Sequence, residues 1–127
     1  MNGAMRVLKL SVTTTGGAGV ATGSTTSTVP VIGLIHAVYL DFHASAPATT
    51  DTTIATKTSP SQTILTVSNS ATDAFIYPRA GAVNSSNSAI TNSFVEFAVQ
   101  DTVTVSLAQC DALTGAVVAT IWYEEMN

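Results

Sequence analysis

The sequence predicts an all-β fold: a jelly-roll-like β-sandwich or small barrel of about eight strands. Three observations support this expectation. Apolar and polar residues alternate over short segments, clusters of Gly, Pro, Asn and Ser separate these segments, and no stretch has helical periodicity. Threonine and serine make up about a quarter of the chain, and the β-branched threonine fits a pleated, half-exposed strand.

The length of 127 residues suits a single domain, which we assign to residues 1–127 with a short N-terminal extension at residues 1–4. Hydrophobic residues make up 46% of the chain and charged residues 9%. Disorder requires poor hydrophobicity together with a high net charge. The chain is therefore expected to fold around one core.

The first predicted strand runs from Met5 to Thr14, where apolar residues at every second position give one buried face. Gly16–Gly19 supplies a turn with the freedom to adopt positive φ. Val20–Thr28 then reads as a return strand with its threonines outward, and Pro30 ends it.

Val31–Phe42 is the most apolar segment of the chain. Its β-branched residues, the internal Gly33 and the preceding Pro30 favour a central strand over a helix. The segment His43–Asp51 contains a proline and small residues, which predicts a loop.

The segment Ala80–Asn92 has little hydrophobic periodicity and many Asn and Ser residues, which predicts a long exposed loop. Asp111–Gly115 is expected to form a turn. The other predicted strands are Thr52–Thr58, Gln62–Val67, Ala74–Tyr77, Phe94–Phe97, Asp101–Gln109 and Ala116–Tyr123.

The charge of the chain limits its partners. Four basic residues against eight acidic ones give a net charge of −4, so there is no basic patch for a row of phosphates, and nucleic acid is not an expected partner. A surface with few long charged side chains loses little side-chain entropy when it is covered. This composition suits packing against another protein.

Two features bear on localisation. The start of the chain, Met1–Leu10, lacks the continuous apolar region of a signal peptide. The longest apolar stretch, Val29–Leu40, is shorter than a membrane helix requires. We expect a protein that is made in the cytoplasm and not inserted into a membrane.

His36, Asp41 and His43 are the residues that most resemble a metal or acid-base site. Strand alternation places Asp41 and His43 on one face and His36 on the other, so at most two ligands converge. No serine lies in a G-x-S-x-G motif, and no Gly-Lys-Ser/Thr follows the glycines of Gly16–Gly23. We therefore expect no metal site, no cofactor and no catalytic residues, and a binding or structural module, not an enzyme.

Cys110 is the only cysteine, so no disulfide forms within the chain. A lone thiol of this kind is expected to fill space in the core.

Carbohydrate binding is an alternative, because jelly rolls often serve as lectins and sugar-binding surfaces need exposed aromatic rings. Phe75 and Tyr77 are expected to form an exposed pair on one strand face. Only one of the adjacent Trp122 and Tyr123 faces outward, and Tyr39 and Phe42, in the apolar central segment, are expected in the core.

Several segments along nearly the whole chain resemble small virion proteins of tailed bacteriophages, in particular head decoration, or cement, proteins. The resemblance rests on strand and turn patterns: M-R-V-L-K-L-S-V-T-T at 5–14, Pro30-Val31-x-Gly33-x-Ile35-x-Ala37-Val38, Thr63-Ile64-Leu65, Tyr77-Pro78-Arg79 and Val103-x-Val105-x-Leu107-Ala108-Gln109. The loops differ from this pattern, above all at Asn84–Asn92.

The resemblance implies a jelly-roll protein, often a homotrimer, that binds the major capsid protein on the outside of an icosahedral phage head and stabilises the shell. It implies a virion location on the capsid surface after synthesis in the host cytoplasm. The alternative that remains open is a carbohydrate- or receptor-binding module of a phage fibre or tail. Residues 1–4 and the Ala80–Asn92 segment are the candidates for reaching a neighbouring molecule.

Overall fold

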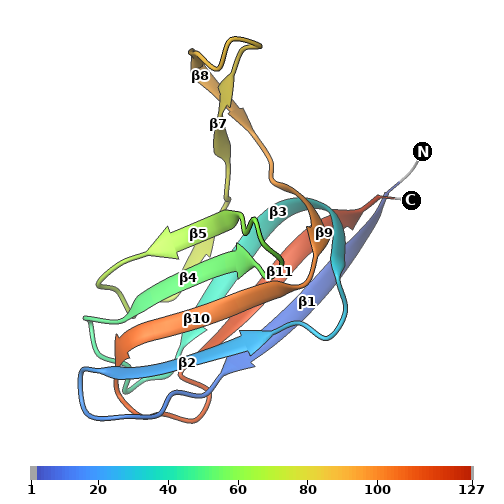
Figure 1. Ribbon diagram of the computed structural model, residues 1–127. Helices are drawn as coiled ribbons and strands as arrows, with labels where there is room; N and C mark the ends of the chain where they lie inside the picture. Colours follow the sequence, from blue (N-terminus) through green and yellow to red (C-terminus); the bar gives the residue numbers. More distant parts are fainter. Residues whose placement is uncertain (1–2, 127) are drawn as a thin grey trace.

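The computed structural model describes residues 3–126, and within them it contains eleven strands and no helix (Figure 1). The strands are β1 (Ala4–Val12), β2 (Ala21–Thr26), β3 (Val31–Phe42), β4 (Asp51–Thr56), β5 (Thr63–Val67), β6 (Ala74–Ile76), β7 (Ala80–Val83), β8 (Ala89–Val95), β9 (Ala98–Asp101), β10 (Val103–Cys110) and β11 (Val117–Glu125).

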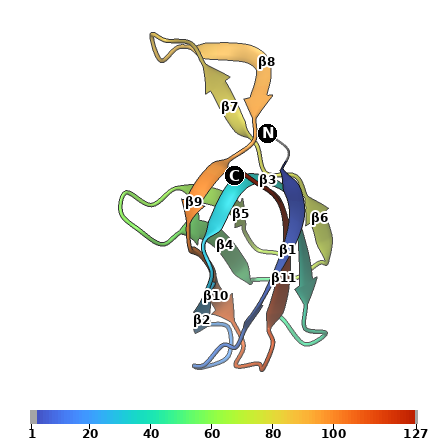
Figure 2. The same ribbon diagram turned by 90° about the vertical axis from the view of Figure 1, so that its right-hand side faces the viewer.

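Eight of these strands form two facing antiparallel sheets in jelly-roll order. One sheet has the order β1-β11-β3-β6, and the other has the order β2-β10-β4-β5. The strand β9 pairs with the beginning of β3 and extends the first sheet. Figures 1 and 2 show the two sheets packed face to face. The predicted all-β, jelly-roll-like sandwich is therefore confirmed.

Alternation of apolar residues builds the core between the sheets. The central strand β3 coincides with the predicted segment, and its inward Val38 lies opposite Ile121 of β11. In the second sheet, inward Val105 of β10 lies opposite Ile54 of β4. All four of these side chains are fully buried, and full burial of such a side chain contributes roughly 1.5–3 kcal/mol. Cys110 is also buried in this core, as expected.

Three sequence predictions need correction. Ala80–Asn92 is not a loop, because β7 and most of β8 lie within it; its exposure, however, was predicted. The predicted strand Phe94–Phe97 ends at Val95, and β9 was not predicted as a separate strand, although its last residue, Asp101, lies in the predicted strand Asp101–Gln109. A register shift between Gly81 and Val83 interrupts the pairing of β7 with β8, which removes the regular alternation that identifies a strand from sequence.

The segment Val20–Thr28 contains a strand, but β2 does not pair with β1 as a hairpin. One isolated β-bridge, between Thr15 and Thr22, joins the segments on either side of the turn. The strand β2 itself pairs with β10 in the other sheet. The predicted N-terminal extension at residues 1–4 is too long by one residue, because β1 begins at Ala4. Met1 and Asn2 lie outside the described residues.

Gly33 allows β3 and β11 to approach closely. Its φ is +153°, a conformation that L side chains rarely adopt, and a Cβ added there would overlap the carbonyl oxygen of Glu124. We expect Gly33→Ala to lower the free energy of unfolding by about 3 kcal/mol or more, because the overlap is with backbone and not with a flexible side chain. Urea denaturation measures this loss.

The matched control is Gly81→Ala in β7, where an added Cβ meets nothing within 4 Å. This variant is expected to change the unfolding free energy by less than about 0.5 kcal/mol. Equal losses in the two variants would contradict the close-approach explanation.

Asp101, at the end of β9, holds the loop that follows β4. Its Oδ2 accepts a hydrogen bond from the backbone N–H of Thr58 at 2.7 Å, and its Oδ1 accepts from the Thr58 hydroxyl at 2.9 Å and from the backbone N–H of Thr102 at 2.8 Å. The Thr58 backbone bond is the main reason that the pKa of Asp101 lies below its ordinary value of 3.8.

A carboxyl group with a lowered folded-state pKa stabilises the fold above its unfolded pKa, and this contribution is lost as the pH falls from 3.8 through the folded pKa. We expect Asp101→Asn to be less stable than the parent near neutral pH and the difference to shrink below pH 3.8. Urea denaturation at a series of pH values checks this. A difference that is the same at every pH would exclude the ionised carboxylate as its cause.

Candidate interaction sites

A two-stranded hairpin projects from one end of the sandwich (Figures 1 and 2). We call residues 80–95, which contain β7 and β8, the arm. The arm contains no charged residue. Its side chains are exposed or half-buried, and the exposed ones include four large apolar residues: Val83, Ile90, Phe94 and Val95.

Local hydrogen bonds shape the tip of the arm. The side-chain oxygen of Asn84 accepts bonds from the backbone N–H groups of Ser86 at 2.9 Å and Ser88 at 3.0 Å. Asn87 adopts a φ of 60°, a conformation that asparagine tolerates better than most residues. The Asn- and Ser-rich composition that suggested a loop therefore encodes the turn between two strands.

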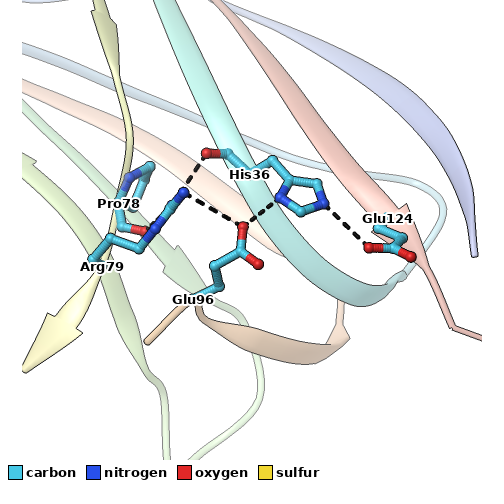
Figure 3. A network of polar contacts seen from close by, with 5 residues as sticks. All are labelled: His36, Pro78, Arg79, Glu96 and Glu124. Atoms are coloured by element: carbon cyan, nitrogen blue, oxygen red, sulfur yellow. Dashed lines mark hydrogen bonds and ion pairs between the residues drawn. The ribbon is translucent and has the colours of Figure 1, made fainter. Parts of the chain in front are cut away.

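A polar network lies where the arm meets the sandwich (Figure 3). Arg79 immediately precedes β7, and Glu96 immediately follows β8. The Nη2 of Arg79 lies 3.5 Å from Glu96 Oε2. The Nη1 of Arg79 donates a hydrogen bond to the backbone carbonyl oxygen of His36 at 3.1 Å. His36 Nδ1 contacts the same Glu96 oxygen, and its Nε2 lies 3.3 Å from Glu124 Oε1. The network joins both ends of the arm to β3 and β11.

A bulge in β3 places His36 in this network. Ala37 pairs with Trp122 and Ile35 pairs with Tyr123, so His36 is an extra residue without its own partner in the register. Glu96 Oε2 is shielded from solvent and has, among the described residues, charged contacts but no well-aligned hydrogen bond. Both ring nitrogens of His36 therefore face carboxylate oxygens, Nδ1 facing Glu96 and Nε2 facing Glu124.

The other candidates for a metal site are not gathered around this histidine. Asp41 is exposed on β3, and His43 lies just beyond the strand, where its Nδ1 accepts the backbone N–H of Ser45 at 3.0 Å. Within residues 3–126, no group of three or more His, Cys, Asp or Glu side chains has the spacing to hold a metal ion.

Aromatic residues gather on the outer face of the first sheet. The ring centroids of Tyr39 (β3) and Phe75 (β6) are 4.6 Å apart, and those of Phe75 and Trp122 (β11) are 5.8 Å apart. Tyr77 follows β6 and is 63% exposed, while Phe75 is 59% exposed. We call Tyr39, Phe75 and Trp122 the aromatic face.

The aromatic face corrects one sequence prediction and agrees with the others. Tyr39 was expected in the core but lies half-buried on the outside, whereas Phe42 is in the core as expected. Trp122 faces outward while its neighbour Tyr123 packs against the core. Ile35 and Val38 both point inward although they are three residues apart, because the bulge at His36 shifts the alternation of inward and outward side chains by one residue. This shift was not visible in the sequence.

The described residues contain no helix long and apolar enough to cross a membrane. A shallow apolar pocket of about 370 Å³ lies between β3 and β9, with Ile32, Leu34 and Val99 among its lining residues. Comparison of the chain with protein-family models, with curated proteins and with solved structures finds no match.

If the polar network holds the base of the arm, a substitution of Glu96 should loosen β7 and β8. Glu96→Gln keeps the side-chain size but removes the charge that faces His36 and Arg79. We expect faster hydrogen exchange of the β7 and β8 amides, with the unfolding free energy of the sandwich changed by less than about 1 kcal/mol, because the groups are partly solvated.

Glu125→Gln is the control, since the Glu125 side chain pairs at 3.1 Å with the exposed Arg6 of β1 and, among the described residues, forms no ion pair with His36 or Arg79. Exchange in the arm that is equally fast in both variants, or unchanged in Glu96→Gln, would show that Glu96 does not hold the arm.

Proposed function

We propose that this protein is a structural protein of a bacteriophage virion, which binds the outside of the icosahedral capsid as a decoration protein and stabilises it. The partner is the major capsid protein, and the protein acts as a homotrimer on the capsid surface. The sequence resemblance suggests this function. The main structural support is the arm, a projecting hairpin with apolar side chains that the rest of the described chain does not cover.

The arm suits a protein partner. An isolated two-stranded hairpin is marginally stable in water, and both of its strands have free edges that pair readily with another chain. Covering Val83, Phe94 and Val95 removes apolar surface from water, and the free edges accept backbone hydrogen bonds. The absence of charge in residues 80–95 excludes attraction to phosphates as the driving force.

Several copies acting together make modest contacts sufficient. A standard protein interface buries about 1,600 Å² in total, and one arm offers only part of such an area. In a trimer, the first contact makes the later ones intramolecular, which raises avidity by roughly 10²–10⁴-fold. A protein that binds only the intact shell stabilises the shell against rupture.

The carbohydrate- or receptor-binding module of a fibre or tail is the second candidate. The observation that favours it is the aromatic face, which contains no residue of the arm. A capsid protein and a glycan use different surfaces in these two functions, so variants separate them.

We expect Phe94→Ala to weaken attachment to phage heads by at least about tenfold, because each copy in the trimer loses one apolar contact. Phe94 is 66% exposed, so its loss should leave the fold intact. Co-sedimentation of the purified protein with heads stripped of it measures attachment. The matched control is Phe75→Ala, which removes a ring of similar exposure outside the arm.

Three further measurements test the proposal with the parent protein. Light scattering should give a trimer, attachment should change little between about 0.05 and 0.5 M salt because ion pairs do not drive it, and decorated heads should rupture at a higher temperature than stripped heads. A monomer that neither sediments with heads nor changes their rupture temperature would refute the proposed function.

A further inference from the structure

We propose that the aromatic face is a binding site for a neutral oligosaccharide built from hexose units. The site lies on the outer surface of the first sheet and shares no residue with the arm. It is therefore a second binding activity in addition to the proposed attachment to the capsid.

The rings form a packed cluster that spans three strands. Phe75 of β6 packs against both Tyr39 of β3 and Trp122 of β11, with interplanar angles of 47° and 32°. The 5.8 Å between the centroids of Phe75 and Trp122 lies within the range of aromatic rings in contact. Large exposed apolar patches on folded proteins mark interaction sites, and exposed rings give rigid contact area for the C–H faces of sugars.

Polar groups border the rings on the side of Tyr39. Asp41 is exposed two residues after Tyr39 on the same strand, and Asp73 precedes β6. Asp73 Oδ1 accepts the backbone N–H of Phe42 at 2.7 Å, which fixes the direction of the carboxylate. Partial burial, followed by the negative charges of Asp73 and Asp41, raises the pKa of Tyr39 above its ordinary value of 10.0.

This combination favours a sugar over a protein or a nucleic acid. Sugar hydroxyl groups donate to carboxylates, while the sugar's C–H groups cover the rings. A protein that covered the same face would have to supply cationic partners for the carboxylates of Asp41 and Asp73, because burying them unpaired is strongly unfavourable. The same carboxylates repel phosphates.

Trp122 is the only tryptophan of the chain, so its fluorescence reports directly on this site. The experiment titrates the parent protein with maltohexaose, cellohexaose and N-acetylchitohexaose. We expect a saturable change in Trp122 emission with at least one of them, with a dissociation constant near or below about 1 mM. No saturable change with any of the three sugars would overturn the proposal.

Two variants test the residues. Phe75→Ala is expected to weaken sugar binding by at least tenfold, and Asp41→Asn by a smaller factor, while both remain folded because the side chains are exposed. Phe94→Ala is the matched control, which removes an equally exposed ring on the arm and should leave sugar binding unchanged. Equal binding by Phe75→Ala and Phe94→Ala would also overturn the proposal.

The same pair of variants separates this site from the proposed function. Phe75→Ala should lose sugar binding and keep its attachment to phage heads, while Phe94→Ala should do the reverse. If Phe75→Ala instead lost attachment to heads and the parent bound no sugar, the aromatic face would be a protein-docking surface and the sugar site would be excluded.

Discussion

The antiparallel pairing of β3 with β11 is the contact on which the rest of the structure depends. On its other side β11 pairs with β1, and β3 pairs with both β6 and β9, so the first sheet is assembled around these two strands. Their inward side chains, such as Val38 and Ile121, form one half of the core. A one-residue slip would move these side chains to the solvent face.

The same pairing places the two candidate interaction sites. A bulge at His36 interrupts the register, and the extra residue reaches the network that holds the base of the arm. Beyond the bulge, the outward positions of the two strands are occupied by Tyr39 and Trp122. Phe75 of β6 packs against both rings. One irregularity thus sets the positions of both a structural anchor and an aromatic surface.

The distribution of polarity also separates the two sites. The arm presents apolar groups and free strand edges without charge, and these are the groups that another protein covers most readily. The aromatic face combines rings with the carboxylates of Asp41 and Asp73, which a ligand rich in hydroxyl groups can satisfy. A jelly roll with distinct surfaces of this kind is suited to hold one partner and present a binding site to another.

The sequence by itself determined the strands of the sandwich and most of its core, because each of these strands buries one face and period-two alternation is a local pattern. It also identified Phe75 and Tyr77 as exposed. Only the tertiary structure decided that 80–95 is a hairpin arm, that Tyr39 faces outward and that His36 meets Glu96 and Glu124. These features depend on bulges and on contacts between residues far apart in the chain, which leave no periodic signal in the sequence.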